Sequence, residues 1–321
     1  MSRTLRTVAA TLAIVCSPTL RADTTALTRP FTELSPVATV RIGHTADWVA
    51  VTADAVWVGS TGPFAVSRID PASNARTARV LLPGEPCAGL VVAFGALWVP
   101  LCTHVPSLAR IDLATLQKTV FTHVGPAAAE GGIAASADSL WLVTDRQGTL
   151  ARIDPASGTI RATAHLPAGS FNPLYSDGVV WVTCAGGAVL TAVDATSGAL
   201  IASVPTGPGP RFLAAGAGFI WTLNQGDGSL SRVDPQGQRE TARIALGTPG
   251  HGGDISVGAG TVFTTMMGVP LSATDAATAI LRRQWRGRGG DSLNIAHGAI
   301  WLTDYRKGTV ARIPLAQVLA R

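Results

Sequence analysis

The sequence predicts an all-β fold, a seven-bladed β-propeller with four-stranded blades, and three observations lead to it. An apolar–Trp–apolar triplet recurs about every 40 residues, a length typical of one propeller blade. Only 14% of the 321 residues are charged and two are lysines, whereas the exposed faces of a helical bundle need Glu and Lys. The 35 glycines and 20 prolines supply the turns that many short strands require.

Two sequence markers define the repeated unit. The first marker is the triplet, centred on Trp57, Trp98, Trp141, Trp181, Trp221, Phe263 and Trp301 with successive spacings of 41, 43, 40, 40, 42 and 38 residues. The second marker follows each triplet and is Arg-Ile-Asp-Pro or a variant, as at Arg68-Ile69-Asp70-Pro71. The chain therefore contains seven units of about 40 residues.

Each unit predicts four strands in a fixed order. An apolar strand begins about nine residues before the Trp, and a two-residue turn such as Asp177-Gly178 ends it. Gly in the second place suits the positive φ of a tight hairpin turn. The Trp strand and the Arg-Ile-Asp strand follow, and a turn such as Asp154–Gly158 leads into an outer strand such as Thr159–Leu166.

The predicted domain covers residues 37–315, and an N-terminal strand closes its ring. The last unit has only three strands, while the spare strand Val37–Ile42 precedes the first unit. Pairing this strand with the last unit would remove an exposed sheet edge. We expect residues 23–36 to form a flexible lead and residues 316–321 a C-terminal tail.

Residues 1–22 have the pattern of a secretory signal peptide. Arg3 and Arg6 precede the apolar run Thr7–Cys16, and Ala22 is a plausible cleavage end. The run is shorter than the roughly 20 residues that span a bilayer. We therefore expect a periplasmic or secreted monomer without a membrane span. Removing the three arginines of this segment lowers the formal net charge from +5 to +2, which argues against a nucleic-acid partner.

Two of the three cysteines outside this segment are predicted to form a disulfide. Cys87 and Cys102 each lie seven residues beyond the nearer residue of the predicted turn Phe94-Gly95. They should face each other across a hairpin at a distance that a disulfide can bridge, the alternative being two buried thiols. Cys184 has no partner at comparable spacing, so we expect a small buried residue there.

The repeated residues are expected to be structural. Each Trp should pack between neighbouring blades, and each repeated Asp should accept hydrogen bonds from the N–H groups of its turn. The Arg two residues earlier is expected on the outer face with its stem on apolar surface. A run of arginines, Arg282, Arg283, Arg286 and Arg288, is interpreted as a solvated edge, with an anionic polymer or lipid headgroup as the alternative.

These repeats resemble two kinds of propeller, the YVTN-type (YncE-like) proteins and the streptogramin-lyase-like (virginiamycin B lyase-like) proteins. The resemblance rests on the Leu-Trp-Val and Arg-Ile-Asp-Pro-x-Ser-Gly motifs and covers nearly the whole chain after residue 22. It implies the fold, which hosts many functions. The lyase resemblance also implies a Mg²⁺-dependent elimination at a lactone ester, with His and Glu in the top loops.

The functional site is expected where the loops leading into the innermost strands meet the loops leaving the Trp strands. The candidate ligand-binding residues are His44, Asp47, Trp48, Asn172, Arg211, Asp254, Asp291, Asp304 and Tyr305. Arg211 would clamp a carboxylate or phosphate through its planar guanidinium. His251, next to three glycines, is the candidate general base, and Glu130 is the second candidate catalytic residue.

A hard cation is the one cofactor that the residues indicate. Oxygen ligands from Glu130, Asn172, Asp254 and Asp291 would suit Mg²⁺ or Ca²⁺. Two main hypotheses follow. The first is an exported propeller that binds a small polar molecule or peptide at these loops. The alternative is a cation-assisted lyase or lactonase that uses His251 and Glu130 on an ester or lactone, and a third possibility is a structural element of an envelope assembly.

Overall fold

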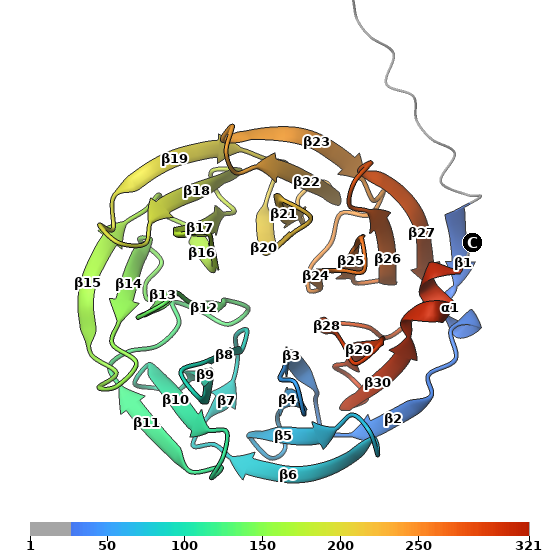
Figure 1. Ribbon diagram of the computed structural model, residues 1–321, viewed down its shortest axis with the longest axis horizontal. Coiled ribbons are helices and arrows are strands. Elements are labelled where there is room, and N and C mark those ends of the chain that lie inside the picture. The colour runs from blue at the N-terminus through green and yellow to red at the C-terminus, as the bar shows by residue number, and fades with distance from the viewer. Residues whose placement is uncertain (1–26, 321) are drawn as a thin grey trace, which may run out of the picture.

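The computed structural model describes residues 27–320 and shows seven sheets arranged as blades around a central axis (Figure 1). The prediction of a seven-bladed propeller is confirmed. The signal peptide predicted over residues 1–22 lies outside the described residues, as does the start of the predicted lead. Among the residues described, no helix is long and apolar enough to cross a membrane.

Each blade is built mainly from antiparallel strands that follow in chain order from the central axis to the periphery, and blades 6 and 7 each add an N-terminal strand at the outer edge. Blade 1 contains β3 (Asp47–Val51), β4 (Val56–Ser60), β5 (Ala65–Asp70) and β6 (Ala75–Leu81). Blade 2 contains β7 (Glu85–Pro86), β8 (Val91–Ala93), β9 (Ala96–Cys102), β10 (Ser107–Asp112) and β11 (Lys118–Thr122). Blade 3 contains β12 (Ile133–Ala135), β13 (Leu140–Val143), β14 (Thr149–Ile153) and β15 (Ile160–His165).

The remaining blades repeat this order. Blade 4 contains β16 (Ser170–Ser176), β17 (Val179–Cys184), β18 (Val189–Asp194) and β19 (Leu200–Pro205). Blade 5 contains β20 (Pro210–Gly216), β21 (Phe219–Asn224), β22 (Ser229–Asp234) and β23 (Arg239–Ala245). Blade 6 contains β24 (Asp254–Gly258), β25 (Thr261–Met266), β26 (Val269–Asp275) and β27 (Ile280–Arg286), and blade 7 contains β28 (Leu293–Ala296), β29 (Ala299–Asp304) and β30 (Thr309–Pro314).

The ring is closed as the sequence predicts. Strand β2 (Ala38–Arg41), from the predicted Val37–Ile42 segment, pairs antiparallel with β30 and completes blade 7. Arg312 reinforces the closure, because its guanidinium donates to the carbonyl of Pro71 (2.6 Å) and to the side chain of Asn74 (2.9 Å) in blade 1. The first and last blades are thus joined by a strand and by a side chain.

Residues on both sides of the predicted domain also pack on the propeller. Strand β1 (Thr28–Pro30), within the predicted lead, pairs in parallel with β27 and adds a fifth strand to blade 6. A 3₁₀ helix, η2 (Phe31–Glu33), and the short helix α1 (Leu315–Leu319) lie beside this edge (Figure 1). The apolar residues Leu34 and Val318 account for this arrangement, because both are buried in the core shared by blades 6 and 7.

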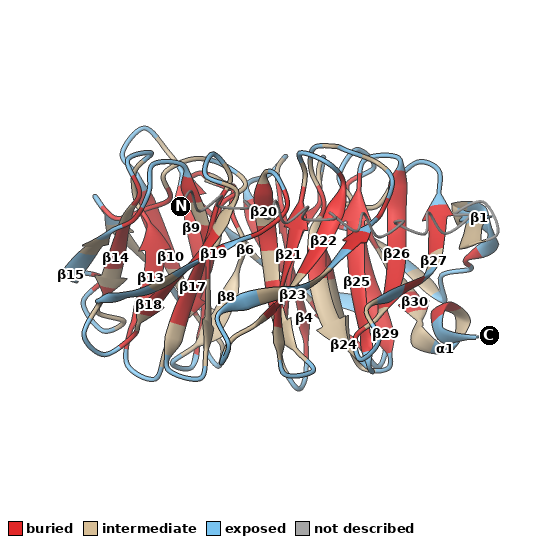
Figure 2. Ribbon diagram, turned by 90° about the horizontal axis from the view of Figure 1, so that it is seen from above, coloured by how far each residue is buried: buried red, intermediate tan, exposed pale blue. Residues whose placement is uncertain are grey.

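The core lies between blades, and burial is concentrated in the strands rather than in the loops (Figure 2). All six tryptophans of the repeat are at most 2% exposed, as is Phe263, which replaces the Trp in blade 6.

The two-residue turns also follow the prediction. In Asp177-Gly178 both residues have positive φ (49° and 84°), which matches the twist of the hairpin.

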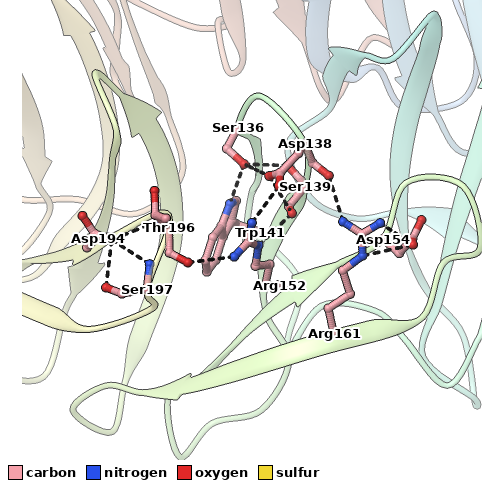
Figure 3. A network of polar contacts seen from close by, with 10 residues as sticks. All are labelled: Ser136, Asp138, Ser139, Trp141, Arg152, Asp154, Arg161, Asp194, Thr196 and Ser197. Atoms are coloured by element: carbon pink, nitrogen blue, oxygen red, sulfur yellow. Dashed lines mark hydrogen bonds and ion pairs between the residues drawn. The ribbon is translucent and has the colours of Figure 1, made fainter.

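The repeated Arg connects neighbouring blades, which the sequence analysis did not anticipate. In blade 3, Arg152 lies over the ring of Trp141 and donates to Ser139 and Asp138 (Figure 3). It also donates to the carbonyl of Thr196 in blade 4, at 3.0 Å. The Asp194 carboxylate, as predicted, accepts hydrogen bonds from backbone N–H groups of its own turn.

The predicted disulfide is present, but the predicted register around it is wrong. Cys87 and Cys102 are bonded with their Cα atoms 5.7 Å apart. They do not face each other directly, because Cys102 pairs with Glu85. The innermost strand is interrupted between β7 and β8, so five residue steps there match only three steps on β9. This irregularity shifts the register by two residues.

Candidate functional site

The predicted loops meet at one end of the ring, which we call the top face. In each blade the innermost strand begins beside the end of the second strand because the two are antiparallel, as the pairing of Asp47 with Gly59 shows. Loops into the first strand and out of the second therefore share this end. The candidate residues accordingly lie at the beginning of innermost strands or in these loops.

A pocket of about 580 Å³ opens on this face between the loops of blades 6 and 7, and Glu130 of blade 3 also lines it. Five candidate residues line this acidic pocket: Glu130, His251, Asp291, Asp304 and Tyr305. Both predicted catalytic residues are therefore brought together with three predicted ligand-binding residues. Tyr305 is 41% exposed, so its phenol ring is available to a ligand.

The carboxyl groups near the acidic pocket raise one another's pKa. Burial is the first cause of the raised pKa values of Asp47, Glu130 and Asp291. Repulsion is the second, because the Asp291 charge raises the pKa of both Asp47 and Glu130, and Asp304 raises that of Asp291. The positive charge of Arg211 lowers the pKa of Glu130, but this pKa is still raised overall. This part of the top face thus brings carboxylates that repel one another close together, although the cations Arg288, Arg306 and Lys307 also line the acidic pocket.

Asp254 sits at the start of β24, beside this group. Burial raises its pKa to about 7, and repulsion from Asp291 and Glu130 acts in the same direction. Its two carboxylate oxygens accept the N–H groups of Ile255 (2.8 Å) and Leu293 (3.1 Å). Because Leu293 belongs to blade 7, Asp254 joins two blades. Its predicted role as a ligand-binding residue is therefore combined with a structural one.

Trp48 lies across the central channel. Its ring packs against Phe212 of blade 5, with ring centroids 6.4 Å apart, and only 5% of the residue is exposed. The backbone of Trp48 has φ of 56°, a strained value for a bulky residue, and its N–H donates to the Asp47 carboxylate (2.7 Å). Trp48 lines a separate channel cavity of about 400 Å³, together with residues of several innermost strands. It is thus a wall of the channel rather than an accessible binding residue.

Three further candidates lie away from the acidic pocket. His44 is exposed and lines none of the pockets found in the described part of the chain. Asn172 is buried, and its side-chain amide donates to the backbone carbonyls of Glu130 (3.4 Å) and Arg211 (2.7 Å). Arg211 lines a different pocket with Phe171 and Arg146.

The cation site stays a prediction, and two of the residues proposed to form it have other contacts. Within residues 27–320, no three His, Cys, Asp or Glu side chains are grouped so that they could hold a metal ion. The Asn172 amide and the Asp254 carboxylate, two of the four proposed ligands, are already bonded to backbone groups. The catalytic hypothesis also lacks an assembled pair, because the His251 side chain has no hydrogen-bond partner among the described residues and is exposed.

The acidic pocket also contains residues that the sequence analysis did not select as site residues. Arg288, Arg306 and Lys307 line it, and the Lys307 ammonium pairs with Asp304 at 3.1 Å. Arg288 had been assigned to a solvated edge. Arg288 is exposed, as a solvated position would be, and it also lines the acidic pocket next to Gly289 and Gly290, which both have positive φ.

Comparisons with known proteins agree with the fold. A family model described as "Outer membrane protein assembly factor BamB" matches residues 50–225. The structure of BamB from Moraxella catarrhalis is similar, with a TM-score of 0.62 and 10% identity over 88% of this chain and 99% of that chain. A streptogramin B lyase structure gives a TM-score of 0.71 and 14% identity over 86% of this chain and 96% of that chain. No curated protein matches the sequence significantly.

Proposed function

The chain belongs to the family of the outer membrane protein assembly factor BamB, and from this premise we propose that it is a binding propeller of the periplasm. Its ligand is a peptide or another small polar molecule with a positively charged group, held in the acidic pocket. A segment of an outer membrane protein is one peptide that such a propeller would meet. The Cys87–Cys102 disulfide supports an exported location, because disulfides persist in oxidising compartments.

The observation that carries this proposal is the repulsion among the carboxylates of the top face. The Asp291 charge raises the pKa values of Asp47 and Glu130, and Asp304 raises that of Asp291, so a cation placed among these carboxylates would stabilise their ionised forms. An ammonium or guanidinium group in the acidic pocket supplies that cation and donates charge-assisted hydrogen bonds. The exposed Met267 (64%) and Tyr305 add apolar surface at the same pocket.

A lyase or lactonase is the second candidate function, since His251 and Glu130 line one pocket. A general base must lie within hydrogen-bond reach of the proton that it removes. The test is turnover of ester and lactone substrates by the protein and by a His251→Ala variant. Turnover that requires His251 would favour catalysis over binding alone, and equal rates in both proteins would eliminate this candidate.

The binding proposal is tested with two dipeptides that differ at the amino terminus, which is free and charged in one and acetylated and neutral in the other. Alanyl-alanine amide has a free ammonium group, whereas acetyl-alanyl-alanine amide has no charge. NMR titration should show that the charged probe binds at least about tenfold more tightly, the range of one or two charge-assisted hydrogen bonds. Glu130→Gln combined with Asp291→Asn should abolish this preference.

A matched control is Glu33→Gln, because this acid is exposed on η2 and lines none of the four top-face and channel pockets. It removes one negative charge without touching the acidic pocket, so the preference should persist. If the two dipeptides bind the unaltered protein equally, the proposed cation preference is wrong.

A further inference from the structure

A second pocket on the top face has two arginines as its only charged lining residues. It encloses about 340 Å³ over blades 3, 4 and 5 and is lined by Arg146, Phe171 and Arg211 together with alanine, glycine and serine residues. None of its lining residues is Asp or Glu. We call it the basic pocket. Glu130 connects the two pockets. It lines the acidic pocket, and its charge attracts Arg211 of the basic pocket.

Arg211 is held in place by its backbone and by an aromatic ring. Its carbonyl accepts hydrogen bonds from the Asn172 amide (2.7 Å) and the Thr183 hydroxyl (3.0 Å). Its guanidinium carbon lies 3.5 Å from the centroid of the Phe171 ring. Stacking of this kind fixes the plane of the guanidinium while leaving its edge free to bind a ligand.

The guanidinium of Arg211 has donors that the protein does not use. It forms no salt bridge and donates no hydrogen bond to any residue in the described range 27–320. Arg211 is only partly exposed, and burial lowers its pKa although the Glu130 charge raises it. A half-buried cation with five unused N–H donors is unfavourable unless an anion satisfies it.

Arg146 supplies a second guanidinium from the loop that follows β13. The carboxylate of Asp145 accepts the N–H groups of Gln147 (2.9 Å) and Thr149 (3.0 Å), which fixes the loop. The Arg146 carbonyl accepts the N–H of Gly169 (3.2 Å), so the loop is also tied to the next blade. The Arg146 side chain itself has no partner within the described chain.

We propose that the basic pocket binds an oxyanion, a carboxylate or a phosphate, between Arg146 and Arg211. The inference extends the proposed function, since a ligand with an anionic group here and a cationic group in the acidic pocket would use both charged halves of the top face. A peptide or amino acid with both termini free has this charge distribution. The planar fork of Arg211 suits two parallel hydrogen bonds to a carboxylate or phosphate.

The experiment is an NMR titration with four dipeptides: alanyl-alanine and its forms with an acetylated amino terminus, an amidated carboxyl terminus, or both. The acetylated form has only the carboxylate and tests the basic pocket alone, while the amide tests the acidic pocket alone. We expect the carboxylate-only form to bind at least about tenfold more tightly than the form with both ends blocked. Inorganic phosphate, titrated separately, shows whether the pocket takes phosphate as well as carboxylate.

Variants assign the binding to the two arginines. Arg146→Gln changes an exposed side chain that has no partner in the described chain, and Arg211→Lys keeps the charge but removes the planar fork. Each variant should weaken the binding of the carboxylate-only form about tenfold. Arg239→Gln is the matched control, because this exposed arginine lies at the start of outer strand β23 and lines neither pocket. It should leave the affinity unchanged.

The results separate this inference from the proposed function. Binding of acetyl-alanyl-alanine or of phosphate that depends on Arg146 and Arg211 supports the basic pocket, whichever result the amide gives. If neither anion binds, or if both bind equally to the protein and to the two arginine variants, the inference is overturned. In that case the amide titration still decides the cation site independently.

Discussion

The stability of the protein should fall as the pH rises from 5 to 8, and Asp254 contributes to this fall. The pKa of this residue is raised from 3.8 to about 7 in the folded state. Between these values the folded protein holds a proton that the unfolded chain has released, so raising the pH favours unfolding. The stabilisation is complete below the unfolded pKa and is lost as the pH passes through the folded pKa.

The size of the effect follows from the shift. One pKa unit corresponds to about 1.4 kcal/mol, so a shift of roughly three units sets an upper limit of about 4 kcal/mol for Asp254. Only the part of the shift between pH 5 and about 7, roughly two units, falls within the tested range, so the expected value is smaller, about 2–3 kcal/mol. The raised pKa values of Asp47, Glu130 and Asp291 act in the same direction and add to the fall.

The assay is urea unfolding followed by Trp fluorescence at several pH values between 5 and 8. In the Asp254→Asn variant the fall in the unfolding free energy between pH 5 and pH 8 should be smaller by about 2–3 kcal/mol. This difference does not depend on how far the substitution changes the stability at any one pH. Asp54→Asn is the control, because the pKa of this exposed carboxyl is lowered and its titration ends below the range. Equal slopes for the protein and for Asp254→Asn would refute the reasoning.

Three other measurements test separate parts of the structure. Replacing Cys87 and Cys102 by Ser should lower the free energy of unfolding by about 3 kcal/mol, since the bond closes a loop with a sequence separation of 15; an unchanged urea midpoint would contradict this. Arg312→Ala should cost about 2 kcal/mol by the same assay because it removes hydrogen bonds between the last blade and the first, whereas Arg239→Ala should stay within about 0.5 kcal/mol. Calorimetry should show that alanyl-alanine amide binds more tightly at pH 7 than at pH 5, since binding needs the ionised carboxylates of the acidic pocket; tighter binding at pH 5 would be inconsistent with it.

The repetitive part of the structure was predictable because every blade is stabilised by the same short-range interactions. The Trp, the Asp turn and the Asp-Gly type of hairpin depend on interactions within a unit or between adjacent units. The disulfide was also found, since it spans one hairpin. The register of the strands around the disulfide was not predicted, because no repeated sequence marker reveals that the innermost strand is interrupted between Pro86 and Val91.

The candidate site was predictable only as a collection of loops. Glu130, His251 and Asp291 were found because the repeat alone places their loops at one end of the ring. Which pocket each side chain enters depends on contacts across the ring, such as that of Trp48 with Phe212, which join residues from different blades. No periodic pattern encodes these contacts, so the division into an acidic and a basic pocket emerged only from the structure.

Carbon-detected NMR titration of the carboxyl groups tests the central claim most directly, because it measures the charge balance of the top face itself. The account predicts a pKa close to 7 for Asp254 and values above the usual range for Asp47, Glu130 and Asp291. It also predicts that adding alanyl-alanine amide lowers the values of Glu130 and Asp291. Values near 4 for all four groups, unaffected by the probe, would contradict it.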